Sequence, residues 1–452
     1  MNPSHTRIGG LDIARGIAVL GTLGTNIWLF THPAGMLGSL VDPLAGLRPG
    51  LETLAYQLLT TLTNGKFLAL LMMMFGIGVT LQHAAWQRRA GALAPGAARP
   101  RGWLRTYAPR AALLFVDGLV NFVLIAEFDI LMGYAFTGFV VATIIASSPR
   151  TARIWAWVAG GVHTAGILLL SASLLLFPAA AGTPDTGTPP ADWPLWNGVN
   201  PYRDSGFLEL ALFRLDNALT FRAEPVLTFA LGVCLFLVGA RLHAAGVFTA
   251  RGARLRRRCM ILGACAAPAD VALGLVGTPA AVLTQRYLTA TLVAVGLLAL
   301  IGHLTAPRTT EAGPDAAAGA GAATGARTSG ADATGPVGSG SPAGTSAVAT
   351  MVRAERPAAV RIPGAHLFGA VGRMSLTCYV GQNLVAGALF YGWGLDLAGR
   401  FPDQRLFLSV SGFALVLAIV VTFIVTWQRW VTGPARRGPL EWLSHAALER
   451  LR

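Results

Sequence analysis

Ten stretches of mostly apolar residues recur along this chain of 452 residues, and most are long enough to cross a lipid bilayer as a helix. Crossing takes about 20 such residues. The predicted spans are 11–30, 54–81, 110–125, 129–147, 153–177, 225–243, 259–277, 283–305, 366–391 and 406–427. One soluble core could not bury so much apolar surface. The pattern therefore predicts an all-α, polytopic integral membrane bundle of about ten helices.

The charged residues support this class and exclude another. Only 12% of the residues are charged, whereas a soluble domain carries about a quarter. The net charge of +14 comes from 34 arginines and a single lysine, clustered in short segments between apolar stretches. A nucleic-acid-binding protein would need a basic stripe on a soluble domain. The predicted partner is the lipid bilayer, and no nucleic-acid partner is expected.

The distribution of basic residues predicts the orientation. With both ends in the cytoplasm, the inner segments contain 25 Lys and Arg residues and the outer segments contain seven. These inner segments are 1–10, 82–110, 148–153, 241–258, 306–364 and 428–452. Such an excess is typical of cytoplasmic loops.

Two long connections divide the chain. Residues 1–305 are predicted to form an eight-helix membrane domain with an outer loop at 178–224. Residues 306–364 are rich in Ala, Gly and Thr and are expected to be a disordered cytoplasmic linker, because they cannot bury enough surface to offset their ordering entropy. Residues 365–452 would then form a helix pair with an interfacial tail containing GPLEWL.

Ionisable residues within spans suggest a functional interior, because burying charge in lipid is costly. They fall into two layers with one acid between them. The inner layer comprises Asp12, Arg15, Asp117 and Arg373, and the outer layer comprises His32, Lys66, Glu127, Asp129 and Arg286. Asp270 lies mid-span beside Pro268, where a kinked helix would face a cavity. Uncharged polar candidates are Asn26, Asn121, His163 and Gln382. Snorkelling, mutual neutralisation and interfacial solvation remain alternatives for both layers.

Signatures of soluble enzymes and metal sites are missing. The four cysteines are scattered singly, and no metal-ligand spacing occurs. There is no Gly-rich phosphate loop, nucleophile elbow or HExxH motif. We therefore expect no metal and no permanently bound cofactor.

Five strings, in order from residue 7 to 443, resemble the YeiB-like bacterial membrane proteins. They are RIGGLDIARGIAVLGTLGTNIWLF, NGKFLALLMMMFGIG, FDILMGYAFTG, GRMSLTCYVGQNL and WQRWVTGPARRGPLEWL. This resemblance implies a multi-pass protein of the bacterial plasma (inner) membrane. The matching motif positions are Asp12, Arg15, Gly16, Asn26, Lys66, Phe67, Gly76, Asp129, Tyr134, Gly372, Arg373, Thr377, Tyr379, Gln382, Pro439, Glu441 and Trp442. The family often has His in the third helix where this chain has Asn121.

That family is in turn distantly similar to membrane acyltransferases of the heparan-glucosaminide acetyltransferase-like superfamily. In those enzymes an Arg of the first helix is separated by ten residues from a His that follows it. Here Arg15 is followed by Asn26, which cannot act as a general base. The resemblance puts the catalytic role at this position in doubt.

The predicted function is a membrane acyltransferase, with two alternatives. In an acyltransferase, acyl-coenzyme A would donate from the cytoplasm, and His32, Glu127 or Asp129 would deprotonate a small-molecule or glycan acceptor. The residues expected to bind substrate or donor are Asp12, Arg15, Asn26, Lys66, Asn121, Tyr134, Asp270, Arg373 and Gln382. The alternative is a small-molecule transporter or exporter using the same intramembrane charges. The third is a membrane scaffold whose polar groups only fix helix packing.

Overall fold

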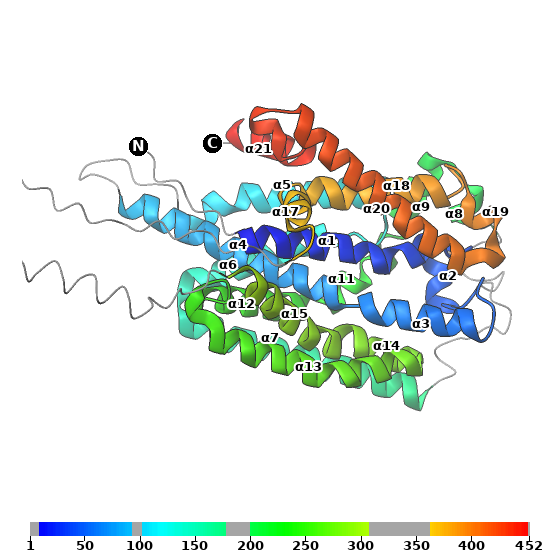
Figure 1. The fold of residues 1–452 in the computed structure, drawn as a ribbon, viewed down its shortest axis with the longest axis horizontal. Helices are drawn as coiled ribbons and strands as arrows, with labels where there is room; N and C mark the ends of the chain where they lie inside the picture. The colour runs from blue at the N-terminus through cyan, green and yellow to red at the C-terminus, as the bar shows by residue number, and fades with distance from the viewer. Residues whose placement is uncertain (1–8, 93–101, 178–198, 307–361, 451–452) are drawn as a thin grey trace, which may run out of the picture.

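The computed structural model describes residues 9–92, 102–177, 199–306 and 362–450, and this part of the chain contains helices and connections without a strand (Figure 1). The amino-terminal helices are α1 (Gly9–Phe30), α2 (Gly35–Val41), α3 (Leu51–Thr63), α4 (Lys66–Gly91), α5 (Trp103–Leu124), α6 (Leu131–Ser147) and α7 (Pro149–Leu176). Next come α8 (Pro201–Asp204), α9 (Phe207–Asp216), α10 (Ala218–Phe221), α11 (Ala223–Leu227), α12 (Phe229–Ala244), η2 (Ala250–Gly252), α13 (Ala253–Val276), α14 (Pro279–Thr284), η3 (Gln285–Thr289) and α15 (Ala290–Thr305). The carboxyl-terminal elements are α17 (Ala365–Arg373), α18 (Ser375–Phe390), α19 (Leu397–Arg400), η4 (Pro402–Gln404), α20 (Arg405–Trp430), η5 (Gly433–Arg437) and α21 (Pro439–Arg450).

The prediction of an all-helical, multi-pass bundle is confirmed. Within the described ranges, seven helices are long and apolar enough to cross a membrane, or eight if the bent pair α10–α11 and α12 counts as one span. The predicted count of ten is not confirmed. Two of the ten predicted segments are shorter in the structure: α6 has 17 residues, and the segment 366–391 is interrupted at Met374 between α17 and α18. At 1.5 Å per residue, 17 residues span only about 26 Å.

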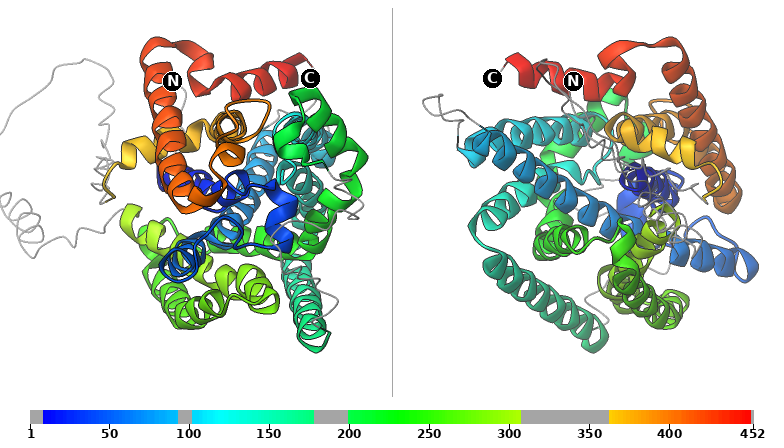
Figure 2. Two further views of the ribbon diagram at one scale, coloured as in Figure 1. Left: turned by 90° about the vertical axis from the view of Figure 1, so that its right-hand side faces the viewer. Right: turned by 60° about the vertical axis from the view of Figure 1, so that its left-hand side comes forward.

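Helix α1 lies toward the middle of the bundle, as the left view of Figure 2 shows. It packs against α4, α17 and α18, while α13 and α15 pack against each other on one side of the bundle and α20 covers the opposite side. Two glycines allow α1 and α17 to touch. A Cβ atom at Gly16 would meet the carbonyl of Phe368, and one at Gly372 would meet the carbonyl of Asp12. Small residues permit such backbone contact between membrane helices.

We call the end at which α1 begins the inner end, following the orientation that the basic residues predict. Helix α21 lies beside this end (Figure 1). Its Glu441 carboxylate accepts hydrogen bonds from the backbone N–H groups of Leu376 (2.8 Å) and Thr377 (3.2 Å) and from Thr377 Oγ1 (2.6 Å). The carboxylate therefore caps the amino terminus of α18, where it also complements the helix dipole. The Glu441 carboxylate thus joins two motifs of the sequence, GRMSLT and GPLEWL.

The domain division stays a prediction. The predicted linker at 306–364 lies almost wholly outside the described residues, as does the first part of the predicted outer loop at 178–224. The described remainder of that loop is helical and comprises α8, α9, α10 and the start of α11.

Three spans are irregular in the outer half of the bundle. Between α3 and α4 the chain breaks at Asn64 and Gly65, where Gly65 has a φ of 74°. The pair α10–α11 and α12 bends by 43° at Thr228. Residues Gln285–Thr289 form a π-helical turn between α14 and α15. Discontinuous helices and π-turns occur preferentially at functional sites in membrane proteins.

Candidate functional site

The first of these irregular regions holds a buried ion pair. Lys66, the first residue of α4, places its Nζ 2.5 Å from Asp270 Oδ2 of α13 and 2.5 Å from the carbonyl oxygen of Thr61. Thr289 Oγ1 of the π-turn donates to Asp270 Oδ1 at 2.9 Å. The Asp270 side chain is 1% exposed. Because Pro268 removes one backbone hydrogen-bond donor inside α13, the helix is locally weakened beside this acid.

A second ion pair joins the π-turn to the bent span. Arg286 donates to Glu224 Oε1 at 2.7 Å and to Asn64 Oδ1 at 2.8 Å, while Tyr287 donates its hydroxyl to the same Glu224 oxygen at 2.8 Å. Asn64 also donates to Gln285 Oε1 at 3.0 Å. The break at Asn64, the π-turn and α11 are therefore connected by side-chain hydrogen bonds.

The connection from α5 to α6 holds two further acids inside the protein. Glu127 is 0% exposed and lies 3.0 Å from Nε of Arg214, whose side chain is 1% exposed. Arg214 also donates to the carbonyl oxygens of Val123 (3.2 Å) and Ile125 (3.1 Å). Asp129 accepts a hydrogen bond from Asn121 at 2.9 Å.

Asp129 combines burial with weak charge compensation. Its carboxylate lies 4.0 Å from Arg222, which donates to the carbonyl oxygens of Asp129 and Glu127. Burial raises the pKa of Asp129 to about 6, although the Met132 N–H group, Asn121 and Arg222 all act to lower it. We call these four pairs, Lys66–Asp270, Glu224–Arg286, Glu127–Arg214 and Asp129–Arg222, the outer ion-pair cluster.

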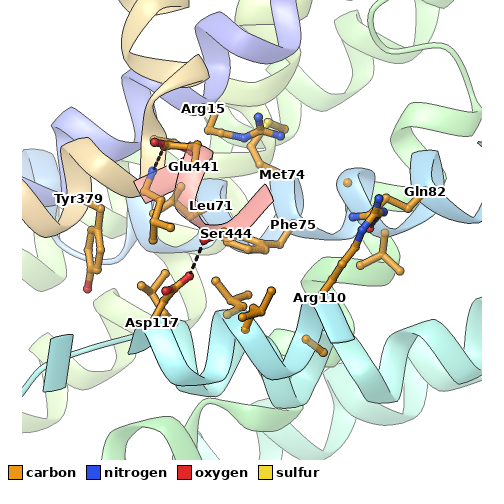
Figure 3. Close-up of a pocket in the computed structure, with 18 of the residues that line it drawn as sticks. Arg15, Leu71, Met74, Phe75, Gln82, Arg110, Asp117, Tyr379, Glu441 and Ser444 are labelled. Carbon is orange, nitrogen blue, oxygen red and sulfur yellow. Dashed lines mark hydrogen bonds between the residues drawn. The ribbon is translucent and has the colours of Figure 1, made fainter. Parts of the chain in front are cut away.

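A cavity of about 450 Å³ occupies the inner half, between α1, α4, α5, α18 and α21 (Figure 3). Its apolar lining comprises Val19, Leu71, Met74, Phe75, Val79, Leu113, Leu114, Ile130, Leu131, Leu376 and Leu448. Its charged and polar lining includes Arg15, Gln82, Arg110, Asp117, Glu441, Ser444 and His445. We call this space the inner cavity. A mostly apolar pocket with a few polar groups is the usual form of a small-molecule site.

The polar groups of the inner cavity come from several helices. Arg110 donates to Gln82 Oε1 at 2.5 Å, and Ser444 donates to Asp117 Oδ2 at 3.2 Å (Figure 3). Arg15 lies on the same face of α1 as Asp12, with 3.9 Å between their charged atoms, as their spacing predicts.

His32 has both ring nitrogens in hydrogen bonds. Its Nδ1 accepts from the backbone N–H of Ala34 at 3.0 Å, so that Nε2 carries the proton and donates to the Asp42 carbonyl, also at 3.0 Å. The residue is 1% exposed, and burial together with nearby Arg405 lowers its pKa to about 3. In this geometry His32 closes the turn after α1 and has no ring nitrogen left to accept a proton.

The remaining predicted site residues form hydrogen bonds between helices. Gln382 donates to Thr22 Oγ1 at 3.2 Å, and Asn26 donates to Asn383 at 3.4 Å, so both lie where α1 meets α18. Arg373 donates to Gln428 at 3.3 Å. Further hydrogen bonds run from Tyr134 to the carbonyl of Leu68 (3.2 Å) and between His163 and the carbonyl of Tyr287 (3.2 Å).

Several residues of the outer ion-pair cluster were not singled out from the sequence. Arg214, Arg222 and Glu224 lie in the predicted outer loop. Asn64 and Gln285, which hydrogen-bond to each other beside the cluster, are uncharged and were not predicted either. One signal was present, since the three outer-loop arginines at 203, 214 and 222 go against the positive-inside bias. Among the described residues, no group of three His, Cys, Asp or Glu side chains is placed to hold a metal ion.

Comparisons with known proteins agree with a membrane family without an assigned activity. Residues 339–450 match the sequence profile of a family described as "Protein of unknown function (DUF418)". Over 155 residues, the chain is 28% identical to "Uncharacterized protein YxaH" of Bacillus subtilis (strain 168). That match covers 34% of this chain and spans about a third, 36%, of the length of the relative. No solved structure matches the chain. The family match is consistent with the YeiB-like resemblance.

Proposed function

We propose that this protein is a small-molecule transporter that works by alternating access across the bacterial inner membrane. The observation that supports it is the contrast between the two halves of the bundle. The inner half contains a cavity of about 450 Å³, whereas the outer half contains four ion pairs and a cavity of only about 30 Å³. A transporter with its substrate site facing one side has this asymmetry.

The location of the ion pairs supports the same function. Lys66, Glu224 and Arg286 lie at or beside helix breaks, where the backbone can change direction without losing a regular ladder of hydrogen bonds. Charges that only fixed the packing would not need to lie at breaks in three separate spans. Breaking and remaking these pairs would open and close the outer half.

The inner cavity indicates the class of cargo. Its walls are mostly apolar and carry the guanidinium groups of Arg15 and Arg110. They also carry two carboxylates that already accept hydrogen bonds, Glu441 at the cap of α18 and Asp117 from Ser444. An apolar molecule with an acidic group would bury its hydrocarbon part against Leu71, Phe75 and Val79 and place its anion near an arginine. We therefore propose a small amphiphilic anion as the cargo.

Cysteine accessibility in vesicles tests alternating access without knowledge of the cargo. In a background lacking the four native cysteines, Gly78→Cys reports on the inner cavity and Thr61→Cys on the closed outer half. Glu224→Gln removes the anion that Arg286 contacts. We expect this change to raise outside labelling of Cys at 61 by an impermeant maleimide at least about fivefold and to lower inside labelling of Cys at 78.

The matched control is Glu52→Gln, which breaks the exposed pair Arg48–Glu52 at the start of α3. It should leave both labelling rates unchanged, because exposed pairs contribute little. Alternating access predicts opposite changes at the two cysteines. A simultaneous rise at both positions, or no change in Glu224→Gln, would contradict the proposal.

The second candidate is an acyltransferase, favoured by the same cavity. The apolar walls suit an acyl chain, and Arg15 and Arg110 suit the phosphates of an acyl-coenzyme A donor. Asp129 precedes Ile130, which lines the inner cavity, and is a candidate base because burial raises its pKa to about 6. Its own side chain lines a separate, smaller cavity. Since both His32 nitrogens are engaged, His32 is the weaker candidate.

Thermal unfolding with acyl thioesters separates the two candidates. If acyl-coenzyme A is the donor, it should stabilise the detergent-solubilised protein by about 2.7 kcal/mol at a hundred times its dissociation constant. Gly78→Trp, which fills the cavity from an open position, should abolish that stabilisation, whereas Gly161→Trp on exposed α7 should not. No stabilisation of the wild type by any thioester would contradict the acyltransferase.

A further inference from the structure

The chain uses lysine at one position only. It contains 34 arginines and a single lysine, and that lysine is Lys66 of the buried pair with Asp270. The other cations of the outer ion-pair cluster are Arg214, Arg222 and Arg286. If Lys66 were needed only for its charge, arginine would serve there as it does in the other three pairs.

Lysine and arginine differ in one chemical property that matters inside a membrane. An ammonium group can release its proton when it is buried, whereas a guanidinium group stays protonated in proteins. The presence of lysine at this one pair therefore suggests that the proton on Nζ is exchanged.

The polar surroundings of the pair continue toward the outer end. Gly274 follows Asp270 by one turn of α13, and a Cβ atom there would meet Thr61 Oγ1 and Gln285 Nε2. Both atoms are buried and have no hydrogen-bond partner within the described ranges. Buried polar groups usually have partners, so these two mark a polar route from Asp270 outward.

The opposite direction is apolar. One turn inward from Lys66 lies Leu70 on α4, and one turn inward from Asp270 lies Ala266 on α13, both buried. Ala290 and Ala294 of α15 are buried beside them. The pair can thus reach the outer side through hydroxyl and amide groups, while apolar packing separates it from the inner side.

We propose that the Lys66–Asp270 pair is a proton-exchange site that couples this transporter to the proton gradient. The proposal rests on the transport function proposed above. With the proton bound, the Lys66 ammonium and the Asp270 carboxylate sum to zero charge. On release the N–H bond breaks, its electron pair stays on Nζ, the proton leaves through the outer polar route, and the pair carries one negative charge. The attraction between the first residue of α4 and α13 is then lost.

The other charged and titratable groups beside this site are Glu224 of α11, Arg286 and Tyr287 of the π-turn, and His163 of α7, whose ring nitrogen lies 3.2 Å from the Tyr287 carbonyl oxygen. Arg286 donates a hydrogen bond to Asn64, and Asn64 donates one to Gln285, so side-chain hydrogen bonds connect these groups to the residues beside Lys66. Because Glu224 and Arg286 neutralise each other, the charge change that accompanies proton release is confined to Lys66 and Asp270. This makes the lysine the group to observe.

A single lysine gives a direct measurement. Protein labelled with [ε-¹³C]lysine, in lipid nanodiscs, has one lysine signal in its NMR spectrum, that of Lys66. We expect this signal to move from the ammonium toward the amine position as the pH is raised, because a proton-exchange site must release its proton. Asp270→Asn should move the midpoint to lower pH, because the carboxylate favours the ammonium form. A signal fixed at the ammonium position from about pH 5 to 9 would overturn the proposal.

Lys66→Arg separates proton exchange from transport itself. Arginine keeps the charge, so the pair can still form, but it cannot release a proton. In the cysteine assay every thiol reacts faster as the pH rises, because its thiolate fraction grows. We therefore expect the increase in outside labelling of Cys at 61 between about pH 6 and 9 to be several-fold larger in the Lys66 protein than in Lys66→Arg. Equal pH responses would refute coupling through Lys66. If Glu224→Gln still shifts accessibility while the lysine signal stays fixed, transport stands and the proton site falls.

Discussion

Replacing Arg214 by leucine is expected to destabilise the protein by about 3–5 kcal/mol, because the substitution leaves the Glu127 carboxylate buried without its cation. Both side chains are essentially inaccessible, with 3.0 Å between Arg214 Nε and Glu127 Oε2. The loss also frees the carbonyl oxygens of Val123 and Ile125, to which the guanidinium donates. Tyr391 approaches the other Glu127 oxygen at 3.3 Å and cannot replace a full charge. The free energy of unfolding in mixed detergent micelles measures the effect.

Two companion variants make the comparison specific. Arg48→Leu removes an arginine from the exposed Arg48–Glu52 pair and should cost less than about 1 kcal/mol. Adding Glu127→Gln to Arg214→Leu should recover part of the loss, because the buried charge is then gone. If Arg214→Leu and Arg48→Leu had equal effects, the connection from α5 to α6 would not depend on this ion pair.

The arginines of the outer segments indicate buried contacts that can be predicted from the sequence. Counting charges predicts the orientation and treats the seven outer arginines as exceptions to a rule. In the structure, four of the seven, Arg214, Arg222, Arg286 and Arg405, contact acids or backbone carbonyls inside the protein. An arginine on the side where the rule disfavours it is therefore a signal of a structural or functional contact, which the sequence alone does contain.

The sequence does not predict which helices are neighbours or which charged residues form ion pairs. Lys66 and Asp270 are 204 positions apart, and nothing in either segment specifies that the start of α4 meets α13. Hydropathy identifies apolar segments, but helix neighbours depend on packing between many side chains. Hydropathy also predicts one continuous helix for any long apolar stretch. It therefore does not predict the break at Asn64 and Gly65 or the π-turn.

The motif residues are easier to explain. Gly16 and Gly372 belong to two of the matched strings and meet across the contact between α1 and α17. Glu441 and Thr377 belong to two others and meet at the cap of α18. These positions concern assembly of the bundle, so a motif shared with a family need not mark the chemistry of its site.

Replacing Gly372 by valine is expected to cost about 3 kcal/mol or more, because the new side chain would meet backbone and not a movable side chain. A Cβ atom at this position would lie against the carbonyl of Asp12 in α1. Overpacking within a core usually costs about 1–3 kcal/mol, when neighbouring side chains can shift. Here only separation of α1 from α17 would relieve the clash. Because α1 also packs against α4 and α18, that movement would disturb the middle of the bundle.

Gly381→Val on α18 makes the same chemical change in the same kind of element, and a Cβ atom at Gly381 has nothing within 4 Å. Valine has a somewhat better helix propensity than glycine, so this control should be neutral or slightly stabilising. Thermal unfolding of the detergent-solubilised variants, together with their yield from membranes, compares the two. A loss confined to Gly372→Val would show that the contact between α1 and α17 limits assembly. Equal behaviour of the two variants would mean that α17 can move away from α1 at little cost, and the carboxyl-terminal helices would then be a separable unit.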